Sequence, residues 1–247
     1  ADEQAEYCGL LLAGLGAEVI KVEPPEGNST RRIGPFYEDQ EGPERSLFFW
    51  QYNRGKRSIV LDLHQQEDRR RLQALVATAD VLLESTPKGQ LDGLGLGAEA
   101  LLQQFPTLIT ARMTAFGDDG PWSGFKGSDL IHLALGGVMM NCGYDSDPHG
   151  KYDLPPIAPQ MWHAYHIAGE QFAMAIIAAL LYRWRSGYPF TPGFRDGVDA
   201  NGDGSGRNDP AFVSDTVTGA ANVIACGSLR GTRQRVPACS ISTSTTS

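Results

Sequence analysis

The sequence predicts an α/β fold in which helices cover both faces of a parallel sheet. Short β-branched segments alternate with amphipathic or apolar helical segments over residues 9–187. The spacing leaves room for a crossover helix between consecutive strands, as parallel βαβ units require. A chain of 247 residues is long enough for one large domain or two small ones.

The expected strands are short and apolar, and turn residues separate them from the helices. The first strand ends at Pro24 and Pro25, because proline cannot donate a backbone hydrogen bond to a sheet. The second strand, "KRSIVLDL", is rich in β-branched residues. The predicted strands are 19–23, 56–63, 80–85 and 107–116.

The helical segments show apolar residues at helical spacing or a continuous apolar run. Only "EDRRRL" carries a basic run, and the acids before it favour a solvated helix face. The predicted helices are an apolar segment around residues 9–14 and the ranges 67–79, 97–105, 127–140 and 160–184.

Composition excludes several classes of function. The net charge of -8 argues against a nucleic-acid-binding surface, which normally carries a basic excess. Four cysteines without C-x-x-C spacing indicate neither a zinc ribbon nor a disulfide frame, and they favour a reducing cytoplasm. The N-terminal acids do not fit an export signal. The longest apolar run, Phe172–Tyr182, is shorter than the roughly 20 residues that span a bilayer, so no membrane partner is expected.

The character of the chain changes after Gly187. Residues 188–247 gather Gly, Asp, Asn, Ser and Thr and end in "SISTSTTS". Such a composition buries too little apolar surface to offset its ordering entropy, so we expect an irregular, poorly packed tail. We divide the chain into 1–187 and 188–247, with the hypothesis that the second part is a chimeric or frame-shifted end.

Four segments of the first part resemble the class III CoA-transferases, the group that includes formyl-CoA and carnitine CoA-transferases and α-methylacyl-CoA racemases. The resemblance covers about residues 5–187. The segments occur in the family's order and approximate spacing, and they read "LGAEVIKVEPPEGNSTRRIGPF", "NRGKRSIVLDL", "ADVLLESTPKGQLDGLGLG" and "AGEQFAMAIIAALLYRWRSG".

This resemblance implies an open, Rossmann-like parallel sheet with flanking helices, of which the chain matches the N-terminal half of the large domain. Family members form interlocked homodimers and act on an acyl-CoA and a carboxylic acid. Coenzyme A is then expected as part of the substrate, without a metal, in cytoplasmic acyl-CoA metabolism.

The resemblance also implies where coenzyme A binds. The segment after "VIKVE" lies near the adenosine phosphate in the family, and cationic donors suit phosphates. Lys56 and Arg57 are either part of this site or a solvent-facing pair at the strand entry. The implied CoA-binding residues are Arg31, Arg32, Lys56, Arg57, Leu61, His64, Ser85 and Thr86.

The family's catalytic aspartate is not found at the matching position. In the transferases it attacks the acyl-CoA thioester and forms a mixed anhydride. Counting back from Gly169 leads to Tyr165, and a phenol with an ordinary pKa near 10 does not replace a carboxylate nucleophile. The racemases pair the aspartate with a His-Asp on the preceding helix, where this chain has Ser128 and Asp129.

The stretch "WHAYHIAGE" around this position places His163, His166 and Glu170 on one helix face. They are interpreted as metal ligands, as substitute catalytic groups near a helix N-terminus, or as structural groups that line the CoA cleft together with Tyr165. In the catalytic interpretation Glu170 is the nucleophile or His166 activates water.

CoA transfer between an acyl-CoA and a carboxylic acid is therefore the first functional hypothesis. The first alternative is a non-catalytic CoA-binding fragment or pseudoenzyme. The second is an acyl-CoA epimerase, lyase or hydrolase that uses the His/Glu face.

Overall fold

The computed structural model describes residues 3–117, 121–143, 146–151, 153–155 and 157–186, and it confirms the predicted α/β class. The tail 188–247 and the hypothesis about its origin lie outside the described residues. The strands are β1 (Ile20–Glu23), β2 (Arg57–Val60), β3 (Val81–Glu84) and β4 (Ile109–Arg112). The α-helices are α1 (Glu3–Gly14), α2 (Leu47–Asn53), α3 (Gln66–Val76), α4 (Ala98–Gln104), α5 (Asp129–Leu135) and α6 (His163–Ser186). Short 3-10 helices occupy Ser29–Arg32, Tyr37–Asp39, Asp92–Leu94 and Val138–Asn141.

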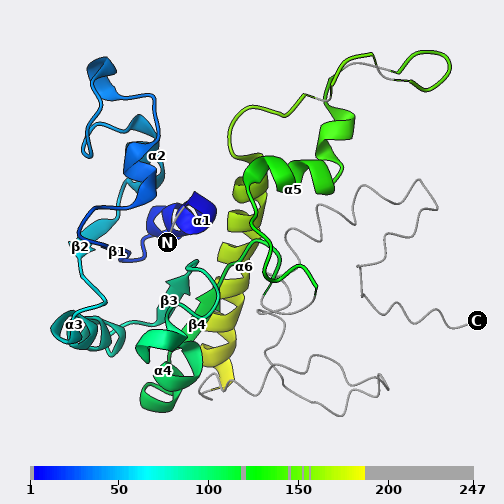
Figure 1. The fold of residues 1–247 in the computed structure, drawn as a ribbon. Coiled ribbons are helices and arrows are strands. Elements are labelled where there is room, and N and C mark those ends of the chain that lie inside the picture. Colours follow the sequence, from blue (N-terminus) through cyan, green and yellow to red (C-terminus); the bar gives the residue numbers. More distant parts are fainter. Residues whose placement is uncertain (1–2, 118–120, 144–145, 152, 156, 187–247) are drawn as a thin grey trace, which may run out of the picture.

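The strands form two parallel pairs. Ile20 of β1 lies opposite Arg57 of β2, and Val81 of β3 lies opposite Ile109 of β4. Among the described residues, no strand pairing joins the two pairs. The connection within the first pair contains α2 and that within the second contains α4. Parallel pairing is therefore as predicted, whereas the sheet is present as two separate pairs (Figure 1).

Two glycines set the direction of the chain before the first strands. Gly16 has φ +98° between α1 and β1, and Gly55 has φ +76° before β2. Residues with a Cβ rarely adopt such angles, so glycine allows the chain to turn from each helix into the next strand.

Helix α2 was not predicted from the sequence. It follows Ser46, whose hydroxyl oxygen accepts a hydrogen bond from the N–H of Phe49 at 3.0 Å. This N-cap satisfies a donor that the first helical turn leaves free. The helix segment "LFFWQYN" is aromatic-rich and lacks a helical period of apolar residues, so periodicity gave no signal there.

Two predicted helices have shifted ends. Helix α5 stops at Leu135 because Gly136 and Gly137 follow it, and Gly137 has φ +75°. Helix α6 begins at His163 because Met161, with φ +71°, cannot belong to a right-handed helix.

The described residues contain two large hydrophobic clusters. The first packs α1 and α6 against β4, with Cys8, Ile109, Phe172 and Ile176 fully buried. The second packs α3 and α4 against residues of β1, β2 and β3, with Leu61 and Leu101 at its centre. Each fully buried large apolar side chain contributes roughly 1.5–3 kcal/mol.

Helix α6, with 24 residues, is by length and composition sufficient to cross a membrane. The sequence estimate counted only Phe172–Tyr182 and was therefore too short. Core helices pass the same test, and one side of α6 is buried against α1 and β4 (Figure 1). In this fold α6 is a core helix with a second, exposed side.

The contact between α1 and α6 depends on Gly169. A Cβ at this position would lie 3.0 Å from the backbone nitrogen of Cys8 and 3.2 Å from the side chain of Tyr7. Any side chain larger than hydrogen would therefore push the two helices apart.

We predict that Gly169→Val destabilises the protein by about 1–3 kcal/mol, because its methyl groups overpack the α1–α6 contact. Chemical denaturation monitored by circular dichroism measures this change. Ala178→Val is the matched control, since Ala178 lies on the exposed side of the same helix. Equal losses in both variants would mean that the close helix contact has no energetic importance.

Candidate active site at the start of helix α6

The first turn of α6 is capped by an acid from another helix. The Asp129 carboxylate, buried at the start of α5, accepts a hydrogen bond from the N–H of Tyr165 at 3.1 Å and another from the N–H of Ala164. Burial raises the pKa of Asp129, and these hydrogen bonds offset only part of that rise. Asp129, which the family resemblance implies as the remaining acid of the racemases' His-Asp pair and as a catalytic candidate, thus lies at the candidate site and caps α6.

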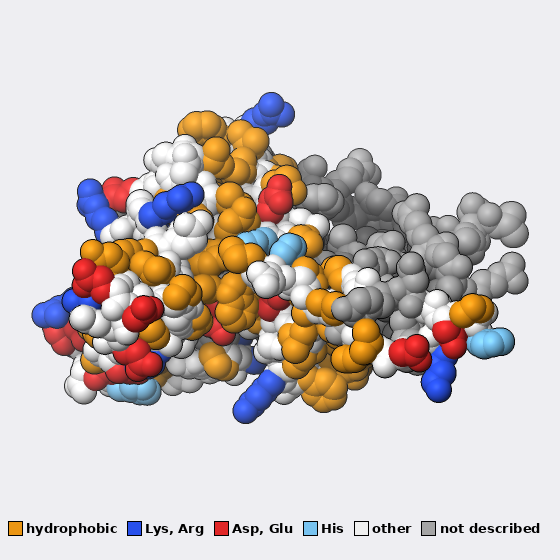
Figure 2. Space-filling view, turned by 90° about the horizontal axis from the view of Figure 1, so that it is seen from above, with side chains coloured by type: hydrophobic (Ala, Val, Ile, Leu, Met, Phe, Trp, Pro, Cys, Tyr) orange, Lys and Arg blue, Asp and Glu red, His pale blue; other side chains and the backbone are white. Residues whose placement is uncertain are grey.

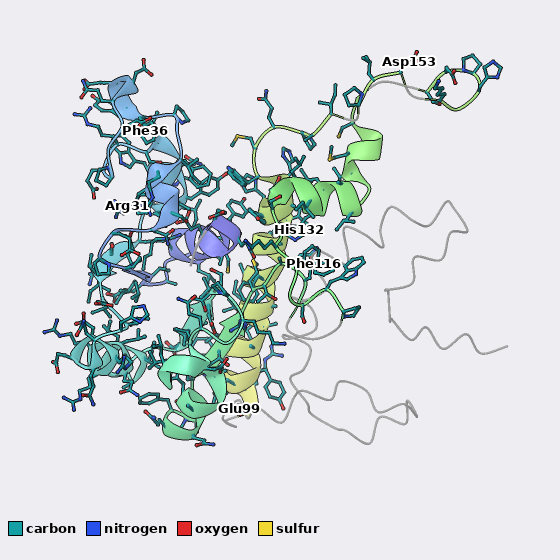
Figure 3. The ribbon with its side chains drawn as sticks, viewed as in Figure 1. Arg31, Phe36, Glu99, Phe116, His132 and Asp153 are labelled. Atoms are coloured by element: carbon teal, nitrogen blue, oxygen red, sulfur yellow. The ribbon has the colours of Figure 1, made fainter. Side chains whose placement is uncertain are left out.

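Tyr165 lies in the middle of this site. It is buried, and its ring stacks on Trp162 at a centroid distance of 5.7 Å with the planes 6° apart. The ring of His132 meets it edge-on at 5.9 Å. Figure 3 labels His132 on α5, close to the start of α6. Stacked and edge-to-face contacts are the favourable geometries for aromatic pairs, so Tyr165 is held by its neighbours.

His166 forms a hydrogen bond with Tyr52 of α2, at 2.6 Å between Nε2 and the phenol oxygen. The ring of Tyr7 from α1 lies 4.5 Å away. Burial lowers the pKa of His166 below its ordinary value of 6.5, and the neighbouring His163 lowers it further. The imidazole is therefore neutral at pH 7, the state that a general base requires.

His163 and Glu170 share this helix but remain open to solvent. The rings of His163 and His166 are 6.3 Å apart. In the described ranges, no group of three or more His, Cys, Asp or Glu side chains is arranged to hold a metal ion. The structure therefore offers no support for the metal interpretation of these residues.

An open groove of about 620 Å³ lies beside the site. Its wall is largely apolar and includes one cation, Lys126. Phe116 joins the groove to the site, because its ring is 5.2 Å from His132 (Figure 3). The groove is lined by Phe116, Trp122, Gly124, Phe125, Lys126, Ile131 and Leu135.

Four of the predicted CoA-binding residues follow the carboxyl ends of β2 and β3. Ligands of open α/β folds bind outside these strand ends. Leu61 is buried in the cluster that also contains Leu82 of β3, and His64 is exposed two residues after Asp62. Ser85 is buried, and Thr86 donates a hydrogen bond to the Glu84 carboxylate. The structure thus brings Leu61 and Leu82 of β3 into a common core, with His64 at the surface.

The predicted phosphate ligand Arg31 is bound within the protein. Its guanidinium donates to both carboxylate oxygens of Glu23, at 2.7 and 2.8 Å, and to Glu44 at 2.8 Å. It also lies 3.8 Å from the ring centroid of Phe49. Arg32 next to it is exposed. Of the two arginines, Arg32 is the one with an accessible side chain.

Lys56 and Arg57 have different environments. Lys56 is largely enclosed and donates to the Glu6 carbonyl at 2.8 Å and to Asn53 at 3.0 Å. Burial lowers its pKa to about 8. Arg57 is exposed and pairs with Glu18 at 2.7 Å. The solvent-facing interpretation therefore fits Arg57, whereas Lys56 joins the inner part of the molecule.

The protein matches the model of CoA-transferase family III over residues 4–188. The chain belongs to this family. It is 38% identical over 185 residues to the succinyl-CoA:(R)-benzylsuccinate CoA-transferase subunit BbsE of Thauera aromatica, covering 75% of this chain and 43% of the relative. It is 39% identical over 179 residues to the acetyl-CoA:oxalate CoA-transferase of Acetobacter aceti, covering 72% and 43%. The chain thus spans less than half the length of these relatives.

A solved structure supports the same assignment. A CAIB/BAIF family protein from Brucella suis superimposes with a TM-score of 0.68 and 36% sequence identity, over 76% of this chain and 48% of that one. The described fold is therefore that of a CoA-transferase family III chain.

Several residues around the candidate site were not predicted from the sequence. Tyr7, Tyr52 and His132 lie far from α6 in the sequence and carried no signal of their own. Glu6 is fully buried, and one of its oxygens accepts from Lys21, Thr30 and Asn53. An acid in the first turn of a helix is normally exposed to solvent, so the sequence pattern alone indicates an exposed Glu6.

The Arg31–Glu23 pair gives a pH prediction. Burial raises the pKa of Glu23, but the hydrogen bonds from Arg31, Ser58 and the Asn28 amide outweigh it and lower the pKa from 4.5 to about 2. The unfolded state therefore binds more protons between these values, and stability falls as pH decreases from about 4.5 to about 2. As the pH decreases across this range, the denaturation midpoint of the wild type should fall more steeply than that of Glu23→Gln. If the midpoints of both proteins change in parallel with pH, the low pKa of Glu23 does not contribute to stability.

Proposed function

We propose that this chain takes part in CoA transfer between an acyl-CoA thioester and a carboxylic acid. The observation that carries the proposal is its family membership, with relatives named as CoA-transferases for succinyl-CoA, oxalate and glutarate. In the chain itself, the strand ends near Leu61 and Ser85 and the groove at Lys126 suit a long, partly apolar ligand with phosphate groups.

We further propose the binding arrangement of the acyl-CoA. The exposed cations Arg32 and Lys126 meet the phosphates, and His64, Ser85 and Thr86 contact the adenine and pantetheine. The thioester then reaches the start of α6 beside Tyr165. Arg31 has no part in phosphate binding, because Glu23 and Glu44 occupy its donors.

Glu170 is the proposed nucleophile, since it is an exposed carboxylate one helical turn after His166. The Glu170 oxygen attacks the thioester carbonyl and expels the CoA thiolate. The product is a mixed anhydride between the acyl group and Glu170. The thiolate then attacks the glutamyl carbonyl, which releases the first acid and leaves CoA as a thioester on Glu170. The second carboxylate attacks this thioester and expels the CoA thiolate, which gives a second mixed anhydride. The thiolate then attacks the acyl carbonyl of the second acid, which forms the new acyl-CoA and releases the Glu170 carboxylate.

The neutral His166 fits this sequence of steps. A neutral imidazole carries no positive charge that would pair with the Glu170 carboxylate. Tyr52 fixes the orientation of the imidazole through the hydrogen bond to Nε2. Tyr165 contributes the wall of the site and takes no covalent step.

Trapping tests the proposal. We predict that incubation with succinyl-CoA and hydroxylamine converts Glu170 to a hydroxamate, which peptide mass spectrometry detects. Glu170→Gln should abolish the label. Glu99→Gln should retain it, because Glu99 lies on α4, far from the start of α6 (Figure 3).

Absence of the Glu170 label, in a protein that still binds CoA by calorimetry, would refute catalysis by this residue. That result would favour the second candidate, a non-catalytic CoA-binding subunit. Two points support this candidate: the family resemblance implies that Tyr165 replaces the catalytic aspartate, and the relative from Thauera aromatica is named as a subunit.

A further inference from the structure

Aromatic side chains are concentrated at the start of α6 instead of in the hydrophobic core. Among the buried residues of the two large clusters, Phe172 is the only aromatic side chain within the described ranges. The start of α6 instead gathers six rings from three helices and the segment before α6. We call them the aromatic wall, and they are Tyr7, Phe48, Tyr52, Trp162, Tyr165 and His166.

The rings of the aromatic wall contact one another in an unbroken series. Phe48 lies 4.5 Å from Tyr52 and meets Trp162 edge-on at 5.4 Å, between ring centroids. Trp162 in turn stacks on Tyr165. Since these contacts join α2 to α6, the rings present one continuous apolar surface.

Part of the aromatic wall is open. Its members Tyr52 and Tyr165 are buried, whereas Tyr7, Phe48 and Trp162 are only half-buried. Met161 at its edge is 63% exposed. Figure 2 shows histidine side chains within a largely hydrophobic part of the surface. A contiguous, partly exposed apolar patch is a candidate binding surface, so the exposed parts of Phe48 and Trp162 are available to a ligand.

The polar groups beside the aromatic wall suit a carboxylate. His163 is exposed, and His166 adjoins it with a ring separation of 6.3 Å. Imidazole N–H groups donate hydrogen bonds to carboxylate oxygens. Asp129 is buried and bound to the first turn of α6. In the proposed steps Glu170 is an uncharged CoA thioester when the second acid arrives, so neither acid repels the incoming carboxylate directly.

We propose that the carboxylic acid exchanged at this site carries an aryl group, which packs on Trp162 and Phe48 while its carboxylate meets His163 and His166. This inference rests on the proposed function for the role of the acid, but binding of the acid is measurable without any transfer. Aromatic pairing adds roughly a factor of ten in affinity over burial of area alone.

Calorimetric titration with phenylacetate and with succinate tests the inference. The wild type should bind phenylacetate about tenfold more tightly than succinate. Trp162→Leu should remove this preference, and Phe48→Leu should reduce it if Trp162→Leu does not fold. Trp184→Leu is the control, because Trp184 is 84% exposed at the other end of α6.

Succinate binding as tight as phenylacetate binding would overturn the inference, as would equal losses in Trp162→Leu and Trp184→Leu. The two proposals fail separately. If phenylacetate does not bind but Glu170 is labelled by hydroxylamine, only the aryl preference is wrong. If phenylacetate binds through Trp162 and no label forms, only the proposed transfer is wrong.

Discussion

The close contact between α1 and α6 at Gly169 is the constraint on which the site depends. Because Gly169 has no side chain, the backbone of Cys8 approaches α6 directly. This approach places Tyr7 of α1 against His166 one turn earlier on α6, and it leaves room for Tyr52 of α2 to bond the same imidazole. A packing requirement in the core thereby determines which side chains surround the proposed reaction position.

Several acids that sequence patterns associate with catalysis or solvation make contacts that hold the fold together. Asp129 caps α6, and Glu23 holds Arg31 through a bidentate pair. Glu84 binds Arg112 at 2.7 Å at the ends of β3 and β4. Breaking a buried pair by removing one partner is costly, so these charges are committed to the fold. The groups left for ligands are the exposed ones, such as Glu170, His163 and Arg32.

The sequence predicted the parts of the fold that depend on local patterns. β-Branched runs gave all four described strands, and apolar spacing gave α3, α4 and α6 to within a few residues. Helix α2 was missed because an aromatic run has no helical period, and its start depends on the single hydroxyl of Ser46. The separation of the strands into two pairs depends on contacts that no local pattern contains.

The helix face of the candidate site was predictable from the sequence, but its contacts were not. The spacing of His163, His166 and Glu170 indicated one helix face, whereas the partner of His166 lies 114 residues away in the sequence. The ion pair between Arg31 and Glu23 was also not predictable. Glu23 is the last residue of a strand, and an acid at that position gives no sign of a buried partner.

Hydrogen–deuterium exchange with and without coenzyme A can decide whether the strand ends and the start of α6 form one acyl-CoA site. Bound ligand slows the exchange of amides that it covers or stabilises. With coenzyme A bound, we expect slower exchange in peptides that contain Leu61–His64, Ser85–Thr86 and the first turn of α6. Exchange in α3 should not change. Unchanged exchange at all three places, under conditions where calorimetry detects CoA binding, would contradict the proposal of one site.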